Sequence, residues 1–574
     1  MKNEKRKSGK QSILFRLLVV IGIIVLLNLL ASRLFLRLDL TSDKRFTISE
    51  KTKEMLRNLK DGVFVKIYLT GDMPAGFKRL SNSTRDLLDE MKIYAGTNLQ
   101  YEFEDPLEGK TEKEKNEILK ELAQNGLEPT NVTVKGEDEY SQKLIIPGAV
   151  VYFQSGVGVP VNLLNNESGM NSQLALNNSE AQLEYKFSSA IKTQLSPTKT
   201  KISFLRGHGE KELYYLYDFV KTLTSFYEAD TLDITKVINI KKQADVLIIV
   251  QPTKAFDEQD KFKIDQFVMN GGKVLWMLDA SNASLDSLTQ KPAMLAINYS
   301  LNLDDQLFNY GVRVNAGLLM DLASNQIPLL VQRNNSATNQ PEFNLFPCPY
   351  FPVVMSETLH SITYGIDAVS TLFPSTIDTV SNKEIKKTVL LHSSKYAKQV
   401  FTPYMIDMRE LRKKPDVGSF NKRNLSVAVL LEGKFKSLYQ NRMTDALQNI
   451  LRDSLKTPFK NNSDENAMIV IADGDMASNE FNKNGQPFSL GYYKYTNDYF
   501  NNKNFLLNCI DYLTNNLNQI ETRGKQVKLR LLDTQKVKKE KTTWQLINIV
   551  VPILSILLFS MVIFIFRLKK YSRL

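Results

Sequence analysis

Hydrophobic residues concentrate in two long segments near the ends of the chain, with a patterned stretch of about 500 residues between them. The first segment covers residues 13–36 and is interrupted by only four polar or charged residues. The second covers residues 544–566 and contains no charged residue. At 1.5 Å rise per residue, a helix of either length crosses a hydrocarbon core of roughly 30 Å. The pattern therefore predicts two transmembrane helices. Each is followed toward its end of the chain by a short terminal tail, residues 1–12 and residues 567–574.

The stretch between the segments begins with a junction over residues 37–60, in which Ser49 has the position and chemistry of a helix N-cap. Residues 61–164 then alternate between strand and helix periods and begin as a β-α-β unit. We predict strands at Val63–Leu69 and Leu99–Phe103, helices at Leu80–Tyr94 and Thr111–Gln124, and a hairpin of Gly148–Phe153 with Val157–Leu163. This order indicates a thioredoxin-like α/β domain. It lacks a Cys-x-x-Cys pair, which argues against redox chemistry.

A linker and helix over residues 165–200, polar from Asn165 to Asn178, lead to a second α/β domain over residues 201–520. The run Val246–Val250 is wholly apolar, as expected of a strand covered on both faces of a parallel sheet. The predicted strands are Lys201–Leu205, Ala244–Val250, Lys273–Leu278, Leu425–Leu431 and Ala467–Ile471, and the predicted helices are Glu212–Leu223, Glu258–Met269 and Lys503–Leu513. Residues 290–420 show no clear period, and we interpret them as an irregular insertion or peripheral β-rich region.

Charge predicts the orientation in the membrane. The two tails hold +8 of the net charge of +12, which leaves +4 for the other 555 residues. The positive-inside rule therefore places both tails in the cytoplasm and exports the middle to the periplasm. A basic juxtamembrane segment, residues 521–543, argues weakly the other way. With so little net charge left in the body, we do not expect a nucleic-acid partner.

The first apolar segment has two interpretations. We expect an uncleaved signal anchor because the apolar core continues to Leu36 without a clean A-x-A site; a cleaved signal peptide is the alternative.

Asn28 and Asn548 lie at similar predicted depths and form a candidate intramembrane contact, of a kind that contributes about 0.6–2 kcal/mol. The alternative is that each amide lies near the outer interface. Cys348 and Cys509 are the only cysteines, so disulfides do not define the fold, although one bridge remains open.

The motif Arg206 to Glu210 follows a predicted strand and precedes a helix. Ligands gather at such strand ends in parallel α/β sheets, and Gly207 and Gly209 allow close approach to the backbone. His208 and Glu210 are therefore candidates for binding a ligand or a partner. The alternative is a tight turn in which Glu210 complements a helix N-terminus. With only three histidines in the chain, a zinc site is not expected.

Asp473 and Asp475 follow another predicted strand end. Their carboxylates suit a hard cation, although aspartates at such positions also cap helices and close turns. The sequence has neither a phosphate-binding G-x-x-x-x-G-K-[ST] loop nor a G-x-S-x-G elbow. We therefore expect no catalytic residues, no metal and no cofactor.

Several segments together resemble a known family: Asp39–Thr41 with Lys44–Ser49, Gly207–Glu210, Ala244–Ile249 with Ile264–Phe267 and Gly271–Trp276, Asp473–Asp475, and Trp544–Pro552. On these residues the chain resembles the ABC-transporter auxiliary-component family, in particular its gliding-motility members. The resemblance implies a separately encoded ABC ATPase and multi-span permease as partners, and a Rossmann-like fold of the class I glutamine amidotransferase-like type for the larger domain. The catalytic cysteine and histidine of that fold have no counterparts here, so its activity is not expected.

The sequence thus predicts a non-enzymatic auxiliary subunit in the cell inner membrane, with both termini cytoplasmic and a periplasmic main domain. Its expected partners are the ATPase and permease, membrane lipid, and envelope or gliding-machinery proteins. One alternative is a membrane-tethered solute-binding protein, in which His208 and Asp473 would form one pocket. A second alternative is an exported hydrolase that depends on His208.

Overall fold

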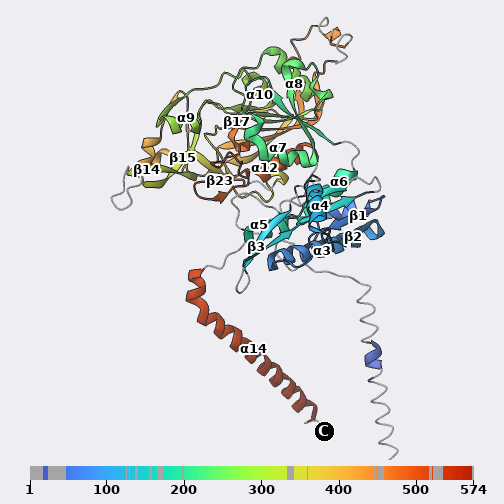
Figure 1. Cartoon of the computed structure of the whole chain (residues 1–574). Coiled ribbons are helices and arrows are strands. Elements are labelled where there is room, and N and C mark those ends of the chain that lie inside the picture. Colours follow the sequence, from blue (N-terminus) through green and yellow to red (C-terminus); the bar gives the residue numbers. More distant parts are fainter. Residues whose placement is uncertain are drawn as a thin grey trace, which may run out of the picture. The chain divides into compact units, whose positions relative to one another are not determined.

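The chain separates into two compact units, residues 1–526 and 527–574. The structure, a computed structural model, describes residues 17, 19–23, 47–124, 126–127, 129–135, 140–153, 158–164, 172–195, 199–332, 342–357, 360–444, 448–449, 451–452, 458–515, 520 and 534–571 (Figure 1). The predicted first transmembrane segment, residues 13–36, therefore lies outside the described residues, apart from a few helical positions between 17 and 23.

A four-stranded sheet with the order β2-β1-β5-β6 forms the centre of the first domain. Strand β1 (Val63–Ile67) is parallel to β2 (Leu99–Phe103) and antiparallel to β5 (Gly148–Tyr152), which pairs with β6 (Gly158–Asn162). The predicted β-α-β unit and hairpin are therefore confirmed. The other elements here are α3 (Ala75–Ala95), α4 (Glu112–Gln124), and the paired strands β3 (Thr130–Lys135) and β4 (Tyr140–Ile145).

Two further helices complete the core of this domain, α5 (Ser172–Ala181) and α6 (Leu183–Leu195). Leu176 and Phe187 are buried with the sheet residues in one hydrophobic cluster. The predicted polar linker over Asn165–Asn178 is therefore wrong for residues 172–178. Asparagine and serine lower helix propensity only slightly, and burial of Leu176 and Phe187 outweighs that cost.

The junction is fixed to this domain by hydrogen bonds. Ser49 caps α2 (Glu50–Arg57) by accepting a bond from the Thr52 N–H at 3.2 Å, as predicted. The Ser49 N–H and the Thr52 hydroxyl both donate to Glu184 of α6, at 2.7 and 2.9 Å. The first residues described after the predicted anchor are thus held by a carboxylate 135 positions away.

The larger domain is built on a seven-stranded sheet with the order β18-β21-β22-β10-β9-β7-β8. The five strands from β22 to β8 are parallel, and β21 and β18 are added antiparallel at one edge. The strands are β7 (Lys201–Arg206), β8 (Glu228–Asp233), β9 (Val246–Val250), β10 (Lys273–Met277), β18 (Ile385–His392), β21 (Ser426–Lys436) and β22 (Asn462–Ile471). All five predicted strands are present, whereas the sequence did not predict β8 and β18.

Helices cover both faces of this sheet (Figure 1). One face packs against α7 (Tyr217–Phe226) and α12 (Asn502–Leu513), and the other against α8 (Glu258–Met269) and α10 (Asp304–Tyr310). Along β9, Ile248 lies in the first core and its neighbours Leu247 and Ile249 lie in the second. Every residue of β9 is buried, which explains its unbroken apolar run.

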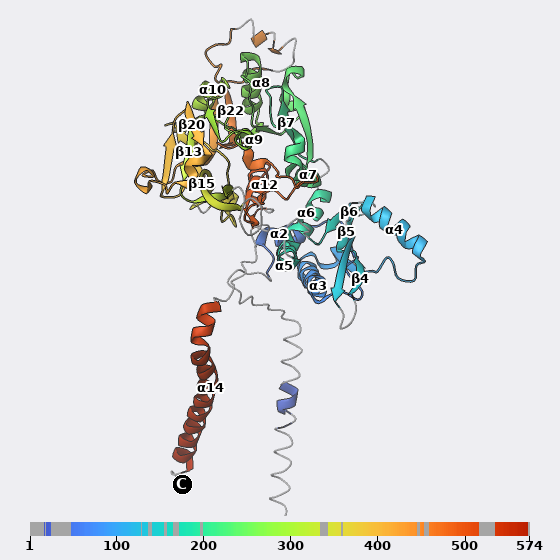
Figure 2. The same cartoon turned by 60° about the vertical axis from the view of Figure 1, so that its left-hand side comes forward.

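Residues 290–420 contribute more to the fold than the interpretation as a peripheral insertion allowed. Strand β18 is an edge of the central sheet, and Leu390 and Leu391 lie in its core. The remaining strands pair as β11 (Ala293–Ala296) with β20 (Tyr404–Asp407), β12 (Val312–Val314) with β17 (Ile377–Thr379), and β13 (Leu318–Asp321) with β19 (Ala397–Val400). Strand β15 (Glu342–Val354) pairs with both β14 (Ser324–Gln332) and β16 (Val369–Ser370). Figure 2 shows β13, β15 and β20 near one another, on the side of the body away from β7. Short strands with bulges gave no readable period.

The second unit contains the long helix α14 (Thr534–Tyr571). Its part from Trp544 to Lys569 contains an 18-residue window with a mean hydropathy of 3.0 and is, within the described ranges, the one helix long and apolar enough to cross a membrane. Asn548 lies in this helix, whereas Asn28 lies outside the described residues. The contact between these two amides therefore stays a prediction.

A glycine provides a test of the β-rich part. Gly317, between β12 and β13, has a φ of +146°, and a Cβ there would lie 2.1 Å from the carbonyl oxygen of Val400. Because backbone must move to relieve this clash, we expect Gly317→Ala to cost about 3 kcal/mol or more in thermal unfolding. Gly271→Ala is the matched control, since its φ is +81° but no atom lies within 4 Å. It should cost about 1–2 kcal/mol. Equal losses would contradict this packing.

Candidate functional site

The loop Gly207–Glu210 follows β7 and turns back tightly against the next strand end. Gly207 and Gly209 have φ values of +131° and +72°, and a Cβ on Gly209 would lie 2.3 Å from the Thr253 hydroxyl oxygen. The His208 carbonyl accepts hydrogen bonds from the N–H groups of Thr253 and Lys254, both at 2.9 Å. Glycine is therefore required here for backbone conformation and for contact with the segment that follows β9.

The His208 ring is buried inside the protein. It stacks on Phe256 with ring centroids 3.8 Å apart, and only 6% of the side chain is exposed. Nε2 lies 3.4 Å from a carboxylate oxygen of Asp260 in α8, and Nδ1 lies 3.7 Å from Oε1 of Glu210. The other Glu210 oxygen accepts the His208 N–H at 2.9 Å. His208 therefore links the loop after β7 to helix α8.

Asp473 caps the turn at the end of β22. One of its oxygens accepts the Met476 N–H at 3.1 Å, at the short 3-10 helix Asp475–Ala477, and the other accepts the Leu372 N–H at 2.9 Å. Among the residues that the structure describes, no group of three or more histidine, cysteine, aspartate or glutamate side chains is arranged to hold a metal ion. The contacts of Asp473 favour the capping alternative.

The two predicted strand-end motifs are joined by Lys211. Its Nζ lies 3.1 Å from an oxygen of Asp475, and its backbone N–H donates to the Val250 carbonyl at 3.0 Å. Burial, the largest single effect, acts to lower the pKa of Lys211, but the carboxylates of Asp475, Asp279 and Asp286 together outweigh it and the pKa is raised. The motifs thus lie at the same edge of the sheet, as the strand-end rule predicts.

Asp279 completes this cluster, although sequence reasoning did not identify it. It accepts the Gly474 N–H at 2.5 Å and a bond from the Gln251 side-chain amide. Burial raises the pKa of Asp279 to about 7, and the Asp475 charge acts in the same direction. Burial, followed by the charge on Asp279, also raises the pKa of Asp473 well above its ordinary value. Asp279 follows β10 closely, so the strand-end rule used for the other motifs would have found it.

Neither cysteine is placed for nucleophilic chemistry. Cys348 and Cys509 are both free thiols and fully buried, in different hydrophobic cores. Burial raises the pKa of the Cys348 thiol to about 12 and that of Cys509 well above its ordinary value. The open question of a disulfide is therefore answered in the negative for this structure. Thiols of this kind are inert.

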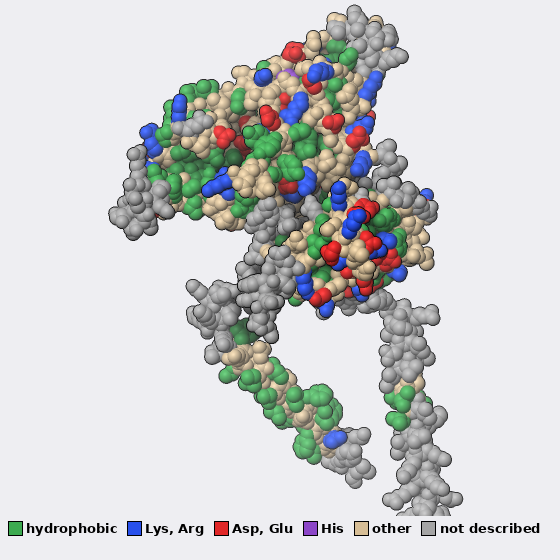
Figure 3. Space-filling model, viewed as in Figure 1, with side chains coloured by type: hydrophobic (Ala, Val, Ile, Leu, Met, Phe, Trp, Pro, Cys, Tyr) green, Lys and Arg blue, Asp and Glu red, His purple; other side chains and the backbone are tan. Residues whose placement is uncertain are grey.

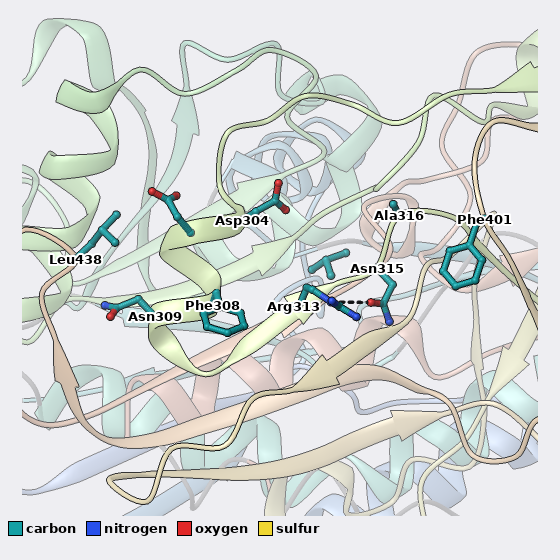
Figure 4. Close-up of a pocket in the computed structure, with 10 residues that line it drawn as sticks. Asp304, Phe308, Asn309, Arg313, Asn315, Ala316, Phe401 and Leu438 are labelled. Carbon is teal, nitrogen blue, oxygen red and sulfur yellow. Dashed lines mark hydrogen bonds between the residues drawn. The ribbon is translucent and has the colours of Figure 1, made fainter.

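Two pockets lie away from these motifs. The larger has a volume of about 710 Å³ and is lined by residues of α10 and β12, with Phe308 and Phe401 as exposed walls (Figure 4). Arg313 projects into it and is held by Asn315 at 3.1 Å and by Asp378 at 2.9 Å. The second, about 560 Å³, lies between α8 and the segment around Tyr439. Neither pocket is lined by His208 or Asp473, so the single pocket required by the solute-binding alternative stays a prediction.

The structural use of His208 can be measured by a double-mutant cycle. We expect His208→Ala to lower the free energy of unfolding by about 2–4 kcal/mol, because it removes a stacked, buried ring. His208→Ala and Asp260→Ala should couple by about 0.5–3 kcal/mol in thermal or denaturant unfolding, since the two side chains touch. Strict additivity, with an unchanged melting temperature for His208→Ala, would instead favour the ligand-binding alternative.

The burial of Asp279 predicts a pH dependence of stability. Because its folded pKa is about 7 and its unfolded pKa is about 4, its contribution is complete below pH 4 and is lost as the pH rises to 7. Between these values, one such group lowers the free energy of unfolding by up to about 1.4 kcal/mol per pH unit. Melting temperatures at pH 5 to 8 should therefore fall less steeply for Asp279→Asn than for the wild type. Asp464→Asn, at an exposed position of β22, is the control and should leave the curve unchanged. Parallel curves for wild type and Asp279→Asn would contradict the assignment.

Comparison with known proteins adds to this geometry. Residues 42–152 match a domain of unknown function, DUF7088. An uncharacterized protein of Borreliella burgdorferi is 20% identical over 568 residues, which cover 97% of this chain and 98% of that protein. A solved structure described as the mmIFT52 N-terminal domain covers 55% of this chain and 97% of its own, at 12% identity and a TM-score of 0.32. A score this low supports no inference about fold or function.

A further match spans the sheet and all the strand-end residues described above. Residues 199–509 match the model of the family described as "ABC-type uncharacterized transport system". The family expected from the sequence motifs is thereby confirmed at this level. Since the match covers more than half of the chain, the protein belongs to this family of ABC transport system auxiliary components.

Proposed function

We propose that the protein is a non-enzymatic, membrane-anchored auxiliary subunit of an ABC-type transporter complex. The observation that carries the proposal is the family match over residues 199–509, which supports an auxiliary role in transport. In this proposal a separately encoded ATPase and a multi-span permease form the rest of the complex. The chain contains no phosphate-binding loop of its own, so the energy of ATP hydrolysis has to come from such a partner.

The distribution of apolar and charged residues supports membrane anchoring. The segment Trp544–Lys569 is long and apolar enough to cross a bilayer, and the short tails carry most of the net positive charge. We propose that both termini are cytoplasmic and that the α/β body lies in the periplasm.

The contacts of the candidate residues support a non-enzymatic role. His208, Glu210 and Asp473 are engaged with neighbouring backbone and side chains, and both thiols are buried. We propose that the body transmits conformational change between the transporter and envelope proteins. The chain also resembles the gliding-motility protein GldG in sequence. We therefore propose that this transmission of conformational change takes part in gliding motility.

The finer fold assignments are part of the same proposal. The sheet order β2-β1-β5-β6 supports a thioredoxin-like first domain. For the larger domain, a parallel sheet covered on both faces supports a Rossmann-like fold of the glutamine amidotransferase-like type.

Affinity purification from mild detergent, followed by mass spectrometry, tests the proposal. We expect an ABC ATPase and a multi-span permease to co-purify with the full chain. Replacing Leu554 and Leu558 with Arg should reduce their recovery several-fold, because each arginine near the bilayer centre costs about 2.5–3.5 kcal/mol. Leu554→Ile with Leu558→Ile is the matched control and should retain both partners. Recovery of the intact chain without either partner would refute the proposal.

The orientation has its own test. Protease added to spheroplasts should degrade the body, and protease added to inside-out vesicles should leave it intact. The reverse pattern would place the body in the cytoplasm and overturn the proposed topology.

A further inference from the structure

Positive charge is concentrated in one stretch of the sequence, residues 383–436, which runs from β18 through β19 and β20 to β21. Residues 383–436 contain 13 lysines and arginines and five acidic residues, a net charge of +8, whereas the whole chain between its two tails carries only +4. Figure 3 shows Lys and Arg side chains on several parts of this face of the larger domain, among them its left-hand end. The other residues between the two tails therefore carry a net negative charge, and residues 383–436 differ from them in the sign of their charge.

Within this region, two chain segments bring four cations together. Residues 394–398 and 421–424 lie side by side: the N–H of Lys422 donates to the Ala397 carbonyl at 2.9 Å, the reverse bond is 3.1 Å, and the Asn424 N–H donates to the Ser394 carbonyl at 3.1 Å. We call the resulting surface the basic strip; it consists of Lys395, Tyr396, Lys398, Lys422 and Arg423.

The basic strip is open to an anionic partner. Lys395, Lys422 and Arg423 are exposed, Lys398 is half-buried, and Tyr396 is 59% exposed. No carboxylate in the described part of the chain forms an ion pair with these four cations. By contrast, nearby Arg409 and Lys413 are paired with Asp407 and Glu410.

The backbone beneath the strip is held in place before any partner binds. Buried Asp321 accepts both the N–H and the hydroxyl of Ser394, at 2.6 and 2.5 Å. The Leu322 N–H donates to the Tyr396 carbonyl at 3.1 Å. Strand β13, which ends at Asp321, pairs with β19 directly beside the strip. The cations are therefore presented from an ordered surface, which lowers the entropy cost of binding.

We propose that the basic strip binds the anionic phospholipid headgroups of a membrane surface. Exposed cations around an amphipathic tyrosine are the composition that favours a bilayer interface. Four cations bind headgroups only weakly, with a dissociation constant of about 1 mM. The body is, however, joined to the apolar helix by only 30 residues between Leu513 and Trp544, and a short tether gives a millimolar effective concentration. Weak headgroup contacts are then sufficient to hold the body against the bilayer.

This inference rests on the proposed membrane anchoring but not on the transporter partners. An acidic protein is the competing occupant. The bilayer is favoured because the proposed anchor keeps one within reach of the strip.

The test uses the full chain with Tyr396→Cys, labelled with an environment-sensitive fluorophore. Cys348 and Cys509 are fully buried, so the new thiol takes the label. The labelled protein is reconstituted in vesicles of phosphatidylcholine alone or with about 30% phosphatidylglycerol. We expect a blue shift of emission only in the anionic vesicles, and we expect at least half of it to disappear in 0.5 M NaCl, where screening shortens the electrostatic range.

Three controls make the result decisive. Lys422→Glu with Arg423→Glu should abolish the shift, whereas Lys434→Glu with Lys460→Glu, an equal charge change elsewhere, should keep it. A label at Tyr364→Cys, another exposed position, should not respond to phosphatidylglycerol. Equal emission in both vesicle types, or a shift that survives Lys422→Glu with Arg423→Glu, would overturn the proposal. Failure of anchoring is distinguishable, because the protein would then be released by an alkaline wash.

Discussion

The central constraint on this protein is that the sheet of its larger domain is buried on both faces. Helices α7 and α12 close one face and α8 and α10 the other, so that neighbouring residues of β9 enter different cores. Burial of a strand such as Val246–Val250 contributes about 1.5–3 kcal/mol for each large apolar side chain, and no polar side chain fits there without losing this gain. Polar residues are therefore displaced to the strand ends.

This displacement explains why the polar motifs meet. The residues after β7, β9, β10 and β22 all reach the same edge of the sheet because these strands are parallel. Lys211, Asp279 and Asp475 contact or influence one another there although they are far apart in sequence. Close packing at these strand ends also buries the carboxylates of Asp279 and Asp473. Both accept hydrogen bonds from backbone N–H groups, and burial raises the pKa of both carboxyls. This end of the sheet has the position of a ligand site. Its polar groups, however, form hydrogen bonds and ion pairs with one another and with nearby backbone.

The surface of the β-rich region has a different character. It is assembled from short strands such as β13 and β19 that contribute little to the central sheet, so its outward residues are free of the packing constraint. Positive charge is concentrated in residues 383–436, part of which lies in this region, in contrast to the rest of the chain between the tails. The buried α/β core therefore maintains the fold, and the β-rich surface carries the site that we propose for binding a membrane.

The long elements were predictable because their periods are strong. Helix Glu258–Met269 was predicted with its correct ends, and the strand Val246–Val250 was recognised from its continuous apolar run. Ser49 was predicted as a cap because capping depends on a local hydrogen bond. The helix at Ser172–Ala181 and the strand at Ile385–His392 were not predicted, since each is stabilised by core residues supplied from distant parts of the chain.

The sequence by itself determined the two apolar segments, the charged tails, the α/β alternation and the family, because each depends on local composition or on a short motif. Only the tertiary structure decided that Asp279 joins the strand-end cluster, that His208 stacks inside the protein, and that Lys395 and Arg423 share one surface. These facts depend on pairings between residues separated by tens to hundreds of positions. Local sequence carries no record of such pairings, because the contacts arise from how the sheet and helices pack.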